Sequence, residues 1–151
     1  MRKSPLLFLA VALIVLALDQ VTKYYIKAYI GPFDVISVTS FFNIVYAENT
    51  GSAFGMFKSL GSLFFIVVSS SAVIALSVMI VKDAGNRIAY SLLLGGAAGN
   101  LLDRFLRGYV IDFLDVFAGT HHWPAFNVAD SALSMGIILL LYKAVFKPHH
   151  D

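Results

Sequence analysis

The sequence predicts an all-α membrane protein of four transmembrane helices, with a small extracytoplasmic β-rich element between the first and second helices. Two observations support this fold class. Of the 151 residues, 59% are hydrophobic and 13% are charged, which is too apolar for a soluble domain of this length. Four apolar stretches also follow one another, and a crossing helix needs about 20 mostly apolar residues. Four crossings would use roughly half of the chain, so we expect a single integral membrane domain over residues 1–151.

The first predicted helix covers about residues 6–27. Thirteen apolar residues, from Leu6 to Leu18, follow Arg2 and Lys3 and would fit a cleavable signal peptide if they stood alone. Three more apolar stretches follow, and no small-residue cleavage pattern precedes Asp19. We therefore expect this first helix to remain uncleaved.

The second predicted helix, about residues 60–81, contains no charged residue between Leu60 and Val81. Its Ser69-Ser70-Ser71 run could be interpreted as a nucleophile. However, serines in membrane helices usually bond back to their own backbone or pack closely against neighbours. The helix also lacks a histidine or lysine to activate a hydroxyl, so packing is the favoured interpretation.

The third predicted helix, about residues 88–106, combines small residues with a polar last turn. Ser91, Gly95 and Gly99 recur every four residues, a spacing that lets two helices approach closely. This packing could occur inside one bundle or in a dimer, and we expect a monomer. The last turn then places Asn100, Asp103 and Arg104 at i, i+3 and i+4, which predicts a common polar face.

The fourth predicted helix covers about residues 128–146, with Asn127 or Asp130 as a good N-cap. The β-rich element is predicted at about residues 33–57, where polar and apolar residues alternate and turn residues follow. The segment Tyr109–Phe126 holds Gly, Pro, adjacent histidines and Trp123, which predicts a loop at the membrane interface.

Charges at the helix ends predict the orientation. Basic residues divide almost evenly, with Arg2, Lys3, Lys82, Arg87, Lys143 and Lys147 beside the termini and Lys23, Lys27, Lys58, Arg104 and Arg107 at the other side. Acidic residues divide sharply, with two beside the termini and seven at the far side. The basic count favours a cytoplasmic position for both termini, more strongly if Lys23 pairs with Asp19 and Arg104 with Asp103. The polar site would then open outward.

The residue types available to that site limit its chemistry. Cysteine is absent, which excludes thiolate ligands and nucleophiles. Adjacent His121 and His122 in a loop seldom bind one ion together and the H-E-x-x-H pattern is missing, so we expect neither a metal nor another cofactor.

Two facing aspartates remain as a candidate reactive pair. At about 4 Å they repel by about 4 kcal/mol at an effective dielectric near 20, or about three pKa units, so they would share one proton. Such a dyad can activate water and protonate a leaving amine.

Spacing alone leaves open which two aspartates form the dyad. Asp103 beside Arg104 fits a structural ion pair, and Asp19 has Lys23 four residues later on the same helix face. Asp112 and Asp115 could pair with each other, or one could face solvent. Asp130 alone would fit a helix cap.

Five motifs give the chain a resemblance to the lipoprotein signal peptidases, also called type II signal peptidases, which are bacterial inner-membrane aspartyl proteases. The resemblance covers nearly the whole chain and keeps the family's motif order. The motifs are Asp19-Gln20-Val21-Thr22-Lys23, Asn49-Thr50-Gly51-Ser52-Ala53-Phe54, Gly99-Asn100-Leu101-Leu102-Asp103-Arg104, Gly108-Tyr109-Val110-Ile111-Asp112-Phe113 and Phe126-Asn127-Val128-Ala129-Asp130-Ser131.

By position, the resemblance implies that Asp112 and Asp130 are the catalytic dyad. It also implies that a set of polar residues binds substrate or orients the dyad, namely Asn49, Asn100, Arg104 and Asn127. Supporting positions fall on Asp19, Lys23 and Asp103.

The substrate implied by the resemblance is a diacylglyceryl-modified prolipoprotein, cleaved on the amino side of its lipidated cysteine. The implied location is the bacterial inner membrane, with membrane lipids but no nucleic acid as partners. Two other hypotheses remain open on residues alone. A proton-coupled transporter would need carboxylates near the bilayer midplane and related halves, and a structural assembly factor would tolerate Asn at positions 112 and 130.

Overall fold

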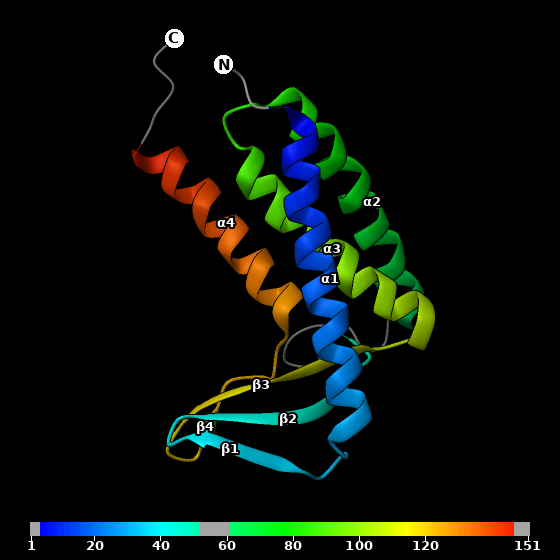
Figure 1. The fold of residues 1–151 in the computed structure, drawn as a ribbon, viewed down its shortest axis with the longest axis vertical. Coiled ribbons are helices and arrows are strands. Elements are labelled where there is room, and N and C mark those ends of the chain that lie inside the picture. The colour runs from blue at the N-terminus through cyan, green and yellow to red at the C-terminus, as the bar shows by residue number, and fades with distance from the viewer. Residues whose placement is uncertain (1–3, 52–60, 147–151) are drawn as a thin grey trace.

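The computed structural model describes residues 4–51 and 61–146, which form four helices and a small antiparallel sheet (Figure 1). The helices are α1 (Pro5–Tyr29), α2 (Gly61–Lys82), α3 (Arg87–Arg107) and α4 (Val128–Phe146). The strands are β1 (Val35–Thr39), β2 (Phe42–Asn49), β3 (Val110–Ala118) and β4 (His121–His122). Several predicted features lie outside the described residues: the Ser52-Ala53-Phe54 part of one motif, the end of the β-rich element, and Arg2, Lys3, Lys58 and Lys147.

Helix α1 is long enough to connect the membrane region with the sheet. It begins at a capping Ser4, whose hydroxyl accepts from the Leu6 amide at 3.3 Å, and Pro5 occupies the first turn. Its 25 residues span about 37 Å at about 1.5 Å per residue, against a hydrocarbon core of about 30 Å. The last turns of α1 therefore reach the sheet (Figure 1), where Ile26 packs against Ile111 and Phe113.

Helix α3 is the central helix of the described bundle, because it packs extensively against α1, α2 and α4. By length and composition α1, Leu63–Lys82 and α4 could cross a membrane. The described α3 is not among these candidates, since Gly, Ala and four charged residues make it less apolar. The predicted membrane protein with four helices is thus confirmed, while the crossing at about residues 88–106 stays a prediction.

Glycines allow α3 to approach two of its neighbours, α1 and α4, closely. A Cβ at Gly96 would lie 2.5 Å from the Ala129 carbonyl oxygen of α4, and one at Gly99 would lie 2.5 Å from Asp19 Oδ2 of α1. Gly95 also faces α1, where a Cβ would meet the Ala12 carbonyl oxygen. The predicted small-residue face is therefore used inside the bundle.

The prediction of a loop over Tyr109–Phe126 is wrong for its first half, which forms β3. The sheet order is β1-β2-β3-β4, with Asn43 opposite Asp115 and Ala47 opposite Asp112. Residues 110–117 are mostly aliphatic and aromatic, but Asp112 and Asp115 interrupt the apolar run and conceal the strand pattern. Pairing with β2 gives the backbone of this segment its hydrogen bonds, and Ile111 and Phe113 enter the core.

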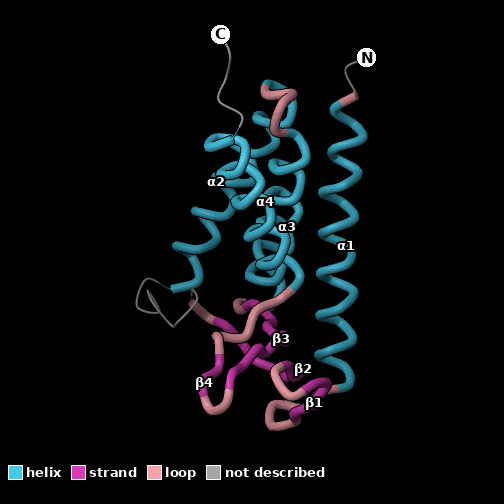
Figure 2. The backbone as a smooth tube through the Cα atoms, turned by 90° about the vertical axis from the view of Figure 1, so that its left-hand side faces the viewer, coloured by secondary structure: helices cyan, strands magenta, loops and turns pink. Residues whose placement is uncertain are grey.

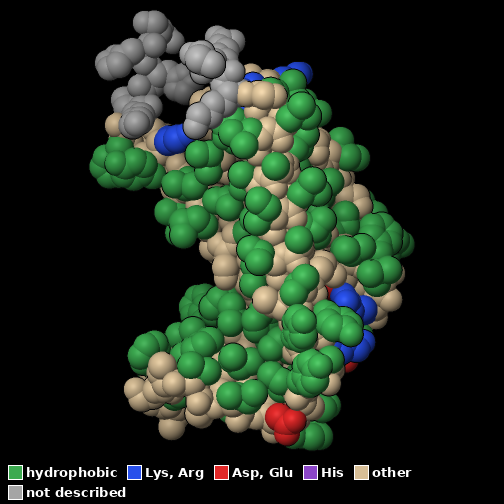
Figure 3. Space-filling view, in the orientation of Figure 1, with side chains coloured by type: hydrophobic (Ala, Val, Ile, Leu, Met, Phe, Trp, Pro, Cys, Tyr) green, Lys and Arg blue, Asp and Glu red, His purple; other side chains and the backbone are tan. Residues whose placement is uncertain are grey.

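The sheet lies at one end of the molecule, while the start of α1 and the end of α4 both lie at the opposite end (Figures 1 and 2). In the space-filling view, hydrophobic side chains are spread over the helical part and over the sheet, and the few charged side chains lie at the end opposite the sheet, where the helices meet the sheet, and at the sheet end (Figure 3). The face of the helical part between these charged groups is apolar, as in a membrane protein.

Candidate active site

A cavity of about 650 Å³ lies where α2, α3, α4 and β3 meet. One part of its lining is apolar helix surface, including Val68, Ala72, Leu133 and Ile137. The other part is polar and consists of side chains singled out from the sequence motifs: Asn49, Asn100, Arg104, Asp112 and Asp130. The cavity thus has an apolar region lined by helices and a polar region that contains a pair of carboxylates.

Asp112 reaches this cavity from β3, where only 3% of the residue is exposed. Two carboxamides donate to its carboxylate: Asn49 Nδ2 to Oδ2 at 3.0 Å and Asn127 Nδ2 to Oδ1 at 2.7 Å. Burial, followed by the negative charge of Asp130, raises the pKa of Asp112 from 3.8 to about 7, against the opposing effect of the two carboxamides. Asp112 can therefore hold or release a proton near neutral pH.

Asp130 lies in the first turn of α4 and takes part in its N-terminal cap. Asn127 Oδ1 accepts from the Asp130 amide at 2.9 Å, and Asp130 Oδ2 accepts from the Asn127 amide at 3.3 Å. This reciprocal arrangement is a capping box. The other carboxylate oxygen, Oδ1, accepts from Asn100 Nδ2 at 2.8 Å. Of the two predicted N-cap residues, Asn127 is the N-cap, while Asp130 completes the cap from the third helix position and also lines the cavity.

The predicted ion pair between Asp103 and Arg104 is wrong. Asp103 contacts Lys23 Nζ at 2.9 Å and also pairs with Arg107, one turn later on α3. Arg104 instead lines the cavity, donates to the Gly51 carbonyl oxygen at 3.2 Å, and lies over the Phe65 ring. Successive helix residues point about 100° apart, so Asp103 shares a face with Arg107 and not with Arg104.

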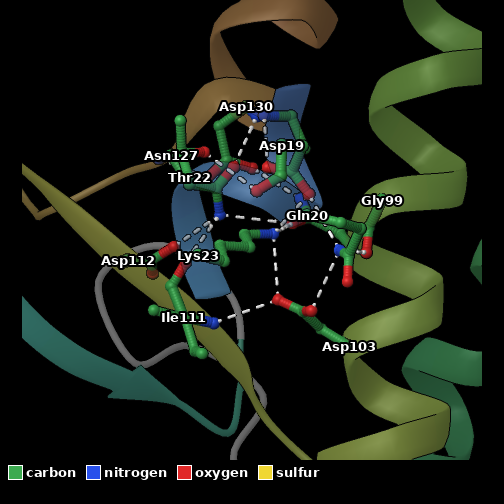
Figure 4. A network of polar contacts seen from close by, with 12 residues as sticks. Asp19, Gln20, Thr22, Lys23, Gly99, Asp103, Ile111, Asp112, Asn127 and Asp130 are labelled. Carbon is green, nitrogen blue, oxygen red and sulfur yellow. Dashed lines mark hydrogen bonds and ion pairs between the residues drawn. The ribbon is translucent and has the colours of Figure 1, made fainter. Parts of the chain in front are cut away.

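The predicted pairing of Asp19 with Lys23 is present, with Nζ 2.8 Å from Asp19 Oδ2. Both side chains are fully buried, and so is Asp103, which completes the cluster from α3. Figure 4 shows the Lys23 side chain between Asp19 and Asp103. The supporting positions implied by the resemblance therefore form one ion cluster next to the cavity.

Sequence reasoning missed two members of that cluster. Gln20 Nε2 donates to Asp19 Oδ2, to the Gly99 carbonyl oxygen and to Asp103 Oδ1. Arg107 pairs with Asp103. The i, i+4 spacing of Asp103 and Arg107 could have revealed the second contact, whereas the three acceptors of Gln20 come together only through the packing of α1 on α3.

Asp115 belongs to a separate polar group. Three residues along a strand place Asp112 and Asp115 on opposite faces of the sheet. Asp115 accepts from Asn43 Nδ2 at 3.0 Å, and its other oxygen lies 2.8 Å from His122 Nδ1. Among the described residues, no group of three or more His, Asp or Glu side chains is placed to hold a metal ion.

A bundle of apolar helices around a cavity with paired carboxylates is typical of a membrane-embedded hydrolase of the aspartic peptidase class. A comparison with family models agrees with this class, because the model described as signal peptidase (SPase) II matches residues 11–146. The chain belongs to the signal peptidase II family.

Individual relatives support the same family. The lipoprotein signal peptidase of Thermodesulfovibrio yellowstonii is 49% identical over 134 residues, covering 89% of this chain and 91% of that protein. The lipoprotein signal peptidase of a Janthinobacterium species is 43% identical over 145 residues, covering 92% of this chain and 88% of that protein. A solved structure described as a bacterial membrane enzyme, determined by the in meso method at 2.3 Å resolution, is 36% identical. It superposes with a TM-score of 0.83 and covers 95% of this chain and 93% of its own. Family membership favours the peptidase over the transporter and assembly-factor hypotheses.

Proposed function

We propose that this chain removes signal peptides from diacylglyceryl-modified prolipoproteins by hydrolysing the peptide bond on the amino side of the lipidated cysteine. Asp112 and Asp130 act as the catalytic dyad. The observation that carries this proposal is the meeting of these two carboxylates, from β3 and from α4, in one cavity whose remaining lining is largely apolar. The names of the relatives support lipoproteins as the substrate class, and the family resemblance of the motifs implies the position of cleavage.

The apolar lining of the cavity suits a lipidated peptide. Its apolar lining comes from three helices, with Val68 on α2, Ala97 on α3 and Leu133 on α4. A signal-peptide helix and acyl chains can lie against this surface without leaving an apolar environment. The scissile bond then reaches the polar end, where the carboxylates are.

The chemistry uses one ionised and one protonated carboxyl group. The ionised member takes a proton from water as the water oxygen attacks the carbonyl carbon of the scissile bond. The protonated member donates to the carbonyl oxygen, and the tetrahedral intermediate then collapses as the C–N bond breaks and the leaving nitrogen receives a proton. No covalent bond forms between enzyme and substrate.

The charges around the cavity favour a single shared proton. Four carboxylates, those of Asp19, Asp103, Asp112 and Asp130, face three cations: Lys23, Arg104 and Arg107. One proton on the dyad makes this group neutral, and buried uncompensated charge is strongly unfavourable. The raised pKa of Asp112, about 7, makes this carboxyl a suitable holder of the proton near neutral pH.

Arg104 is suited to hold the substrate backbone. Its planar guanidinium carries five N–H donors, and described contacts direct two of its nitrogens to the Gly51 and Asn100 carbonyl oxygens. Because Arg104 lines the same cavity as the dyad, its other donors can reach a substrate carbonyl. Asn49, which lies beside Asp112, is the second substrate-facing amide.

The segment that carries Trp123 acts as a clamp together with β1 and β2. Trp123, Pro124 and Phe126, from the segment between β4 and α4, also line the cavity. Closing them over a bound substrate would exclude water and strengthen the electrostatic interactions of the dyad. Unchanged turnover and inhibitor affinity in Trp123→Ala would remove this residue from the clamp.

The deciding experiment is cleavage of a purified diacylglyceryl-modified prolipoprotein by the full chain in lipid. Wild type is compared with Asp112→Asn and Asp130→Asn, and a chelator is added in parallel. The matched control is Asp115→Asn, which changes a carboxylate of the same strand on the opposite face of the sheet. We expect both dyad variants to fold and to lose cleavage, the control to cleave, and the chelator to have no effect. Full activity of either dyad variant would refute the assignment.

A further inference from the structure

A fully buried lysine lies beside the catalytic pair without lining the cavity. Lys23 Nζ is 2.8 Å from Asp19 Oδ2 and 2.9 Å from Asp103 Oδ2 (Figure 4), and none of these three residues is exposed. None of them is part of the cavity lining. Buried ion pairs are weak evidence for stability, because apolar replacements of similar volume are often neutral or stabilising. The position of this ion triad therefore indicates another role.

Each aspartate of the triad uses a carboxylate oxygen to hold the backbone next to one member of the dyad. Asp19 Oδ1 accepts from the amide of Ala129 at 2.9 Å, and Ala129 immediately precedes Asp130. Asp103 Oδ2 accepts from the amide of Ile111 at 3.2 Å, and Ile111 immediately precedes Asp112. One ammonium group thus connects, through two carboxylates, to the backbone at both dyad positions.

Lys23 also determines which way a site carboxamide points. Its Nζ donates to Asn100 Oδ1 at 3.0 Å, and an ammonium group has donors only. The oxygen of the Asn100 carboxamide must therefore face Lys23, so its NH₂ group faces Asp130 Oδ1 at 2.8 Å. The same Asn100 oxygen accepts from Asn127 Nδ2 at 3.2 Å, and Asn127 Nδ2 also donates to Asp112 Oδ1.

We propose that Lys23 is a positioning residue for the reaction, which fixes the Asn100 carboxamide and, through Asp19 and Asp103, the backbone at Asp130 and Asp112. The inference rests on the proposed function, since it takes Asp112 and Asp130 as the catalytic pair. Its role is to hold both carboxylates in the geometry in which one activates water and the other holds a proton. Lys23 itself does not touch the substrate.

A charge-balanced double variant separates positioning from folding. Lys23→Met combined with Asp19→Asn removes one positive and one negative charge, and leaves Asp103 paired with Arg107. Asn at position 19 keeps a carbonyl oxygen for the Ala129 amide. The variant loses the donor that fixes Asn100, the link between the two carboxylates, and the acceptor that Asp19 Oδ2 offers to Gln20 Nε2.

The test measures kcat, KM and thermal midpoint with the lipidated prolipoprotein substrate. The matched control is Lys27→Met, which removes the next lysine of α1, an exposed residue bonded to the Tyr109 hydroxyl. We expect the double variant to fold, to keep KM within about twofold, and to lose at least about 100-fold in kcat, as misplaced catalytic groups do. The control should keep both constants.

Other outcomes would overturn the inference. An unchanged kcat, or a raised KM at unchanged kcat, would show that Lys23 does not position the dyad. Lys23→Met combined with Asp103→Asn gives a second charge-balanced variant, and failure of both to fold would assign the triad to folding alone. Asp112→Asn and Asp130→Asn are measured alongside. If they retain cleavage, the proposed dyad itself fails, whatever Lys23 does.

Discussion

At the scale of single residues, Asn127 shows how one side chain serves both the fold and the site. Its carboxamide oxygen caps α4 by accepting from the Asp130 amide. Its NH₂ group is shared among Asp112 Oδ1, Asn100 Oδ1 and the Ile111 carbonyl oxygen. The oxygen therefore belongs to the helix cap and the nitrogen to the dyad, so the two roles can be separated by substitution.

Asn127→Ser should keep the helix cap and lose the activity. Serine caps helices about as well as asparagine, but its short side chain has no NH₂ group to donate to Asp112, and it adds no charge at this buried position. We expect a modestly lower thermal midpoint and a loss of at least about 100-fold in kcat. Cleavage kinetics and a thermal melt on the same preparation measure both. A variant that remains active would contradict the role of Asn127 as a donor to Asp112.

The raised pKa of Asp112 predicts a pH dependence of stability. Between pH 3.8 and about 7 the folded state keeps a proton that the unfolded chain has released. The unfolding free energy of wild type should therefore fall as the pH rises through this window, by at most about 4 kcal/mol, and stay level above it. Asp112→Asn cannot ionise and should escape this loss.

Thermal melts of wild type and Asp112→Asn at pH 5 and pH 8 check this expectation. The thermal midpoint of the variant should be higher relative to wild type at pH 8 than at pH 5. Asp34→Asn, which changes an exposed carboxylate that accepts from the Gly31 amide, is the control. Parallel pH curves for wild type and Asp112→Asn would contradict burial as the cause of the raised pKa.

At the scale of elements, the sequence predicts the helices and the contacts within one helix, but not the strands and contacts that depend on pairing with another segment. The four helices follow from apolar runs, and the i, i+4 pairing of Asp19 and Lys23 follows from helix geometry. The sequence pattern does not reveal strand β3, because Asp112 and Asp115 interrupt its apolar residues, whereas in the structure pairing with β2 stabilises the strand. The contact between Lys23 and Asp103 joins residues 80 positions apart in the sequence, and it follows only from the packing of α1 on α3. Among the aspartates, the resemblance, not the spacing, singles out Asp112 and Asp130.

The close contact of α3 with α4 predicts that Gly96→Ala destabilises the bundle. The added Cβ would meet the Ala129 carbonyl oxygen at 2.5 Å, directly before Asp130. Overpacking of this kind typically costs about 1–3 kcal/mol, and separation of the helices would also displace Asp130. We expect a lower thermal midpoint and reduced kcat. Ala98→Ser, which also adds one atom to α3 but at a half-buried position, should have little effect. Equal behaviour of the two variants would argue against the close contact.

At the scale of the whole molecule, the sheet lies at one pole, and the start of α1 and the end of α4 lie at the opposite pole (Figure 2). A chain without cysteine allows single cysteines to report which pole faces which side of the membrane. Ser40→Cys, in the turn between β1 and β2, and Ala84→Cys, between α2 and α3, are both exposed and lie at different poles.

We expect a membrane-impermeant maleimide to label Ser40→Cys in intact spheroplasts and Ala84→Cys only after lysis. This result follows from cytoplasmic termini and an outward-facing site. The cysteine-free parent chain is the background control, and both variants must retain cleavage. Labelling of Ala84→Cys alone in intact spheroplasts would invert the proposed orientation.

The ion pairs within α1 and α3 have a consequence for biogenesis. Asp19 pairs with Lys23 inside α1, and Asp103 pairs with Arg107 inside α3, each at i, i+4 spacing. A charge placed alone in a bilayer is unfavourable by about 2.5–3.5 kcal/mol on insertion scales. Each helix, however, carries the counter-charge for its own aspartate on the next turn. Neither aspartate therefore needs the other helix for its counter-charge during insertion, and the link between Lys23 and Asp103 forms only when the two helices assemble.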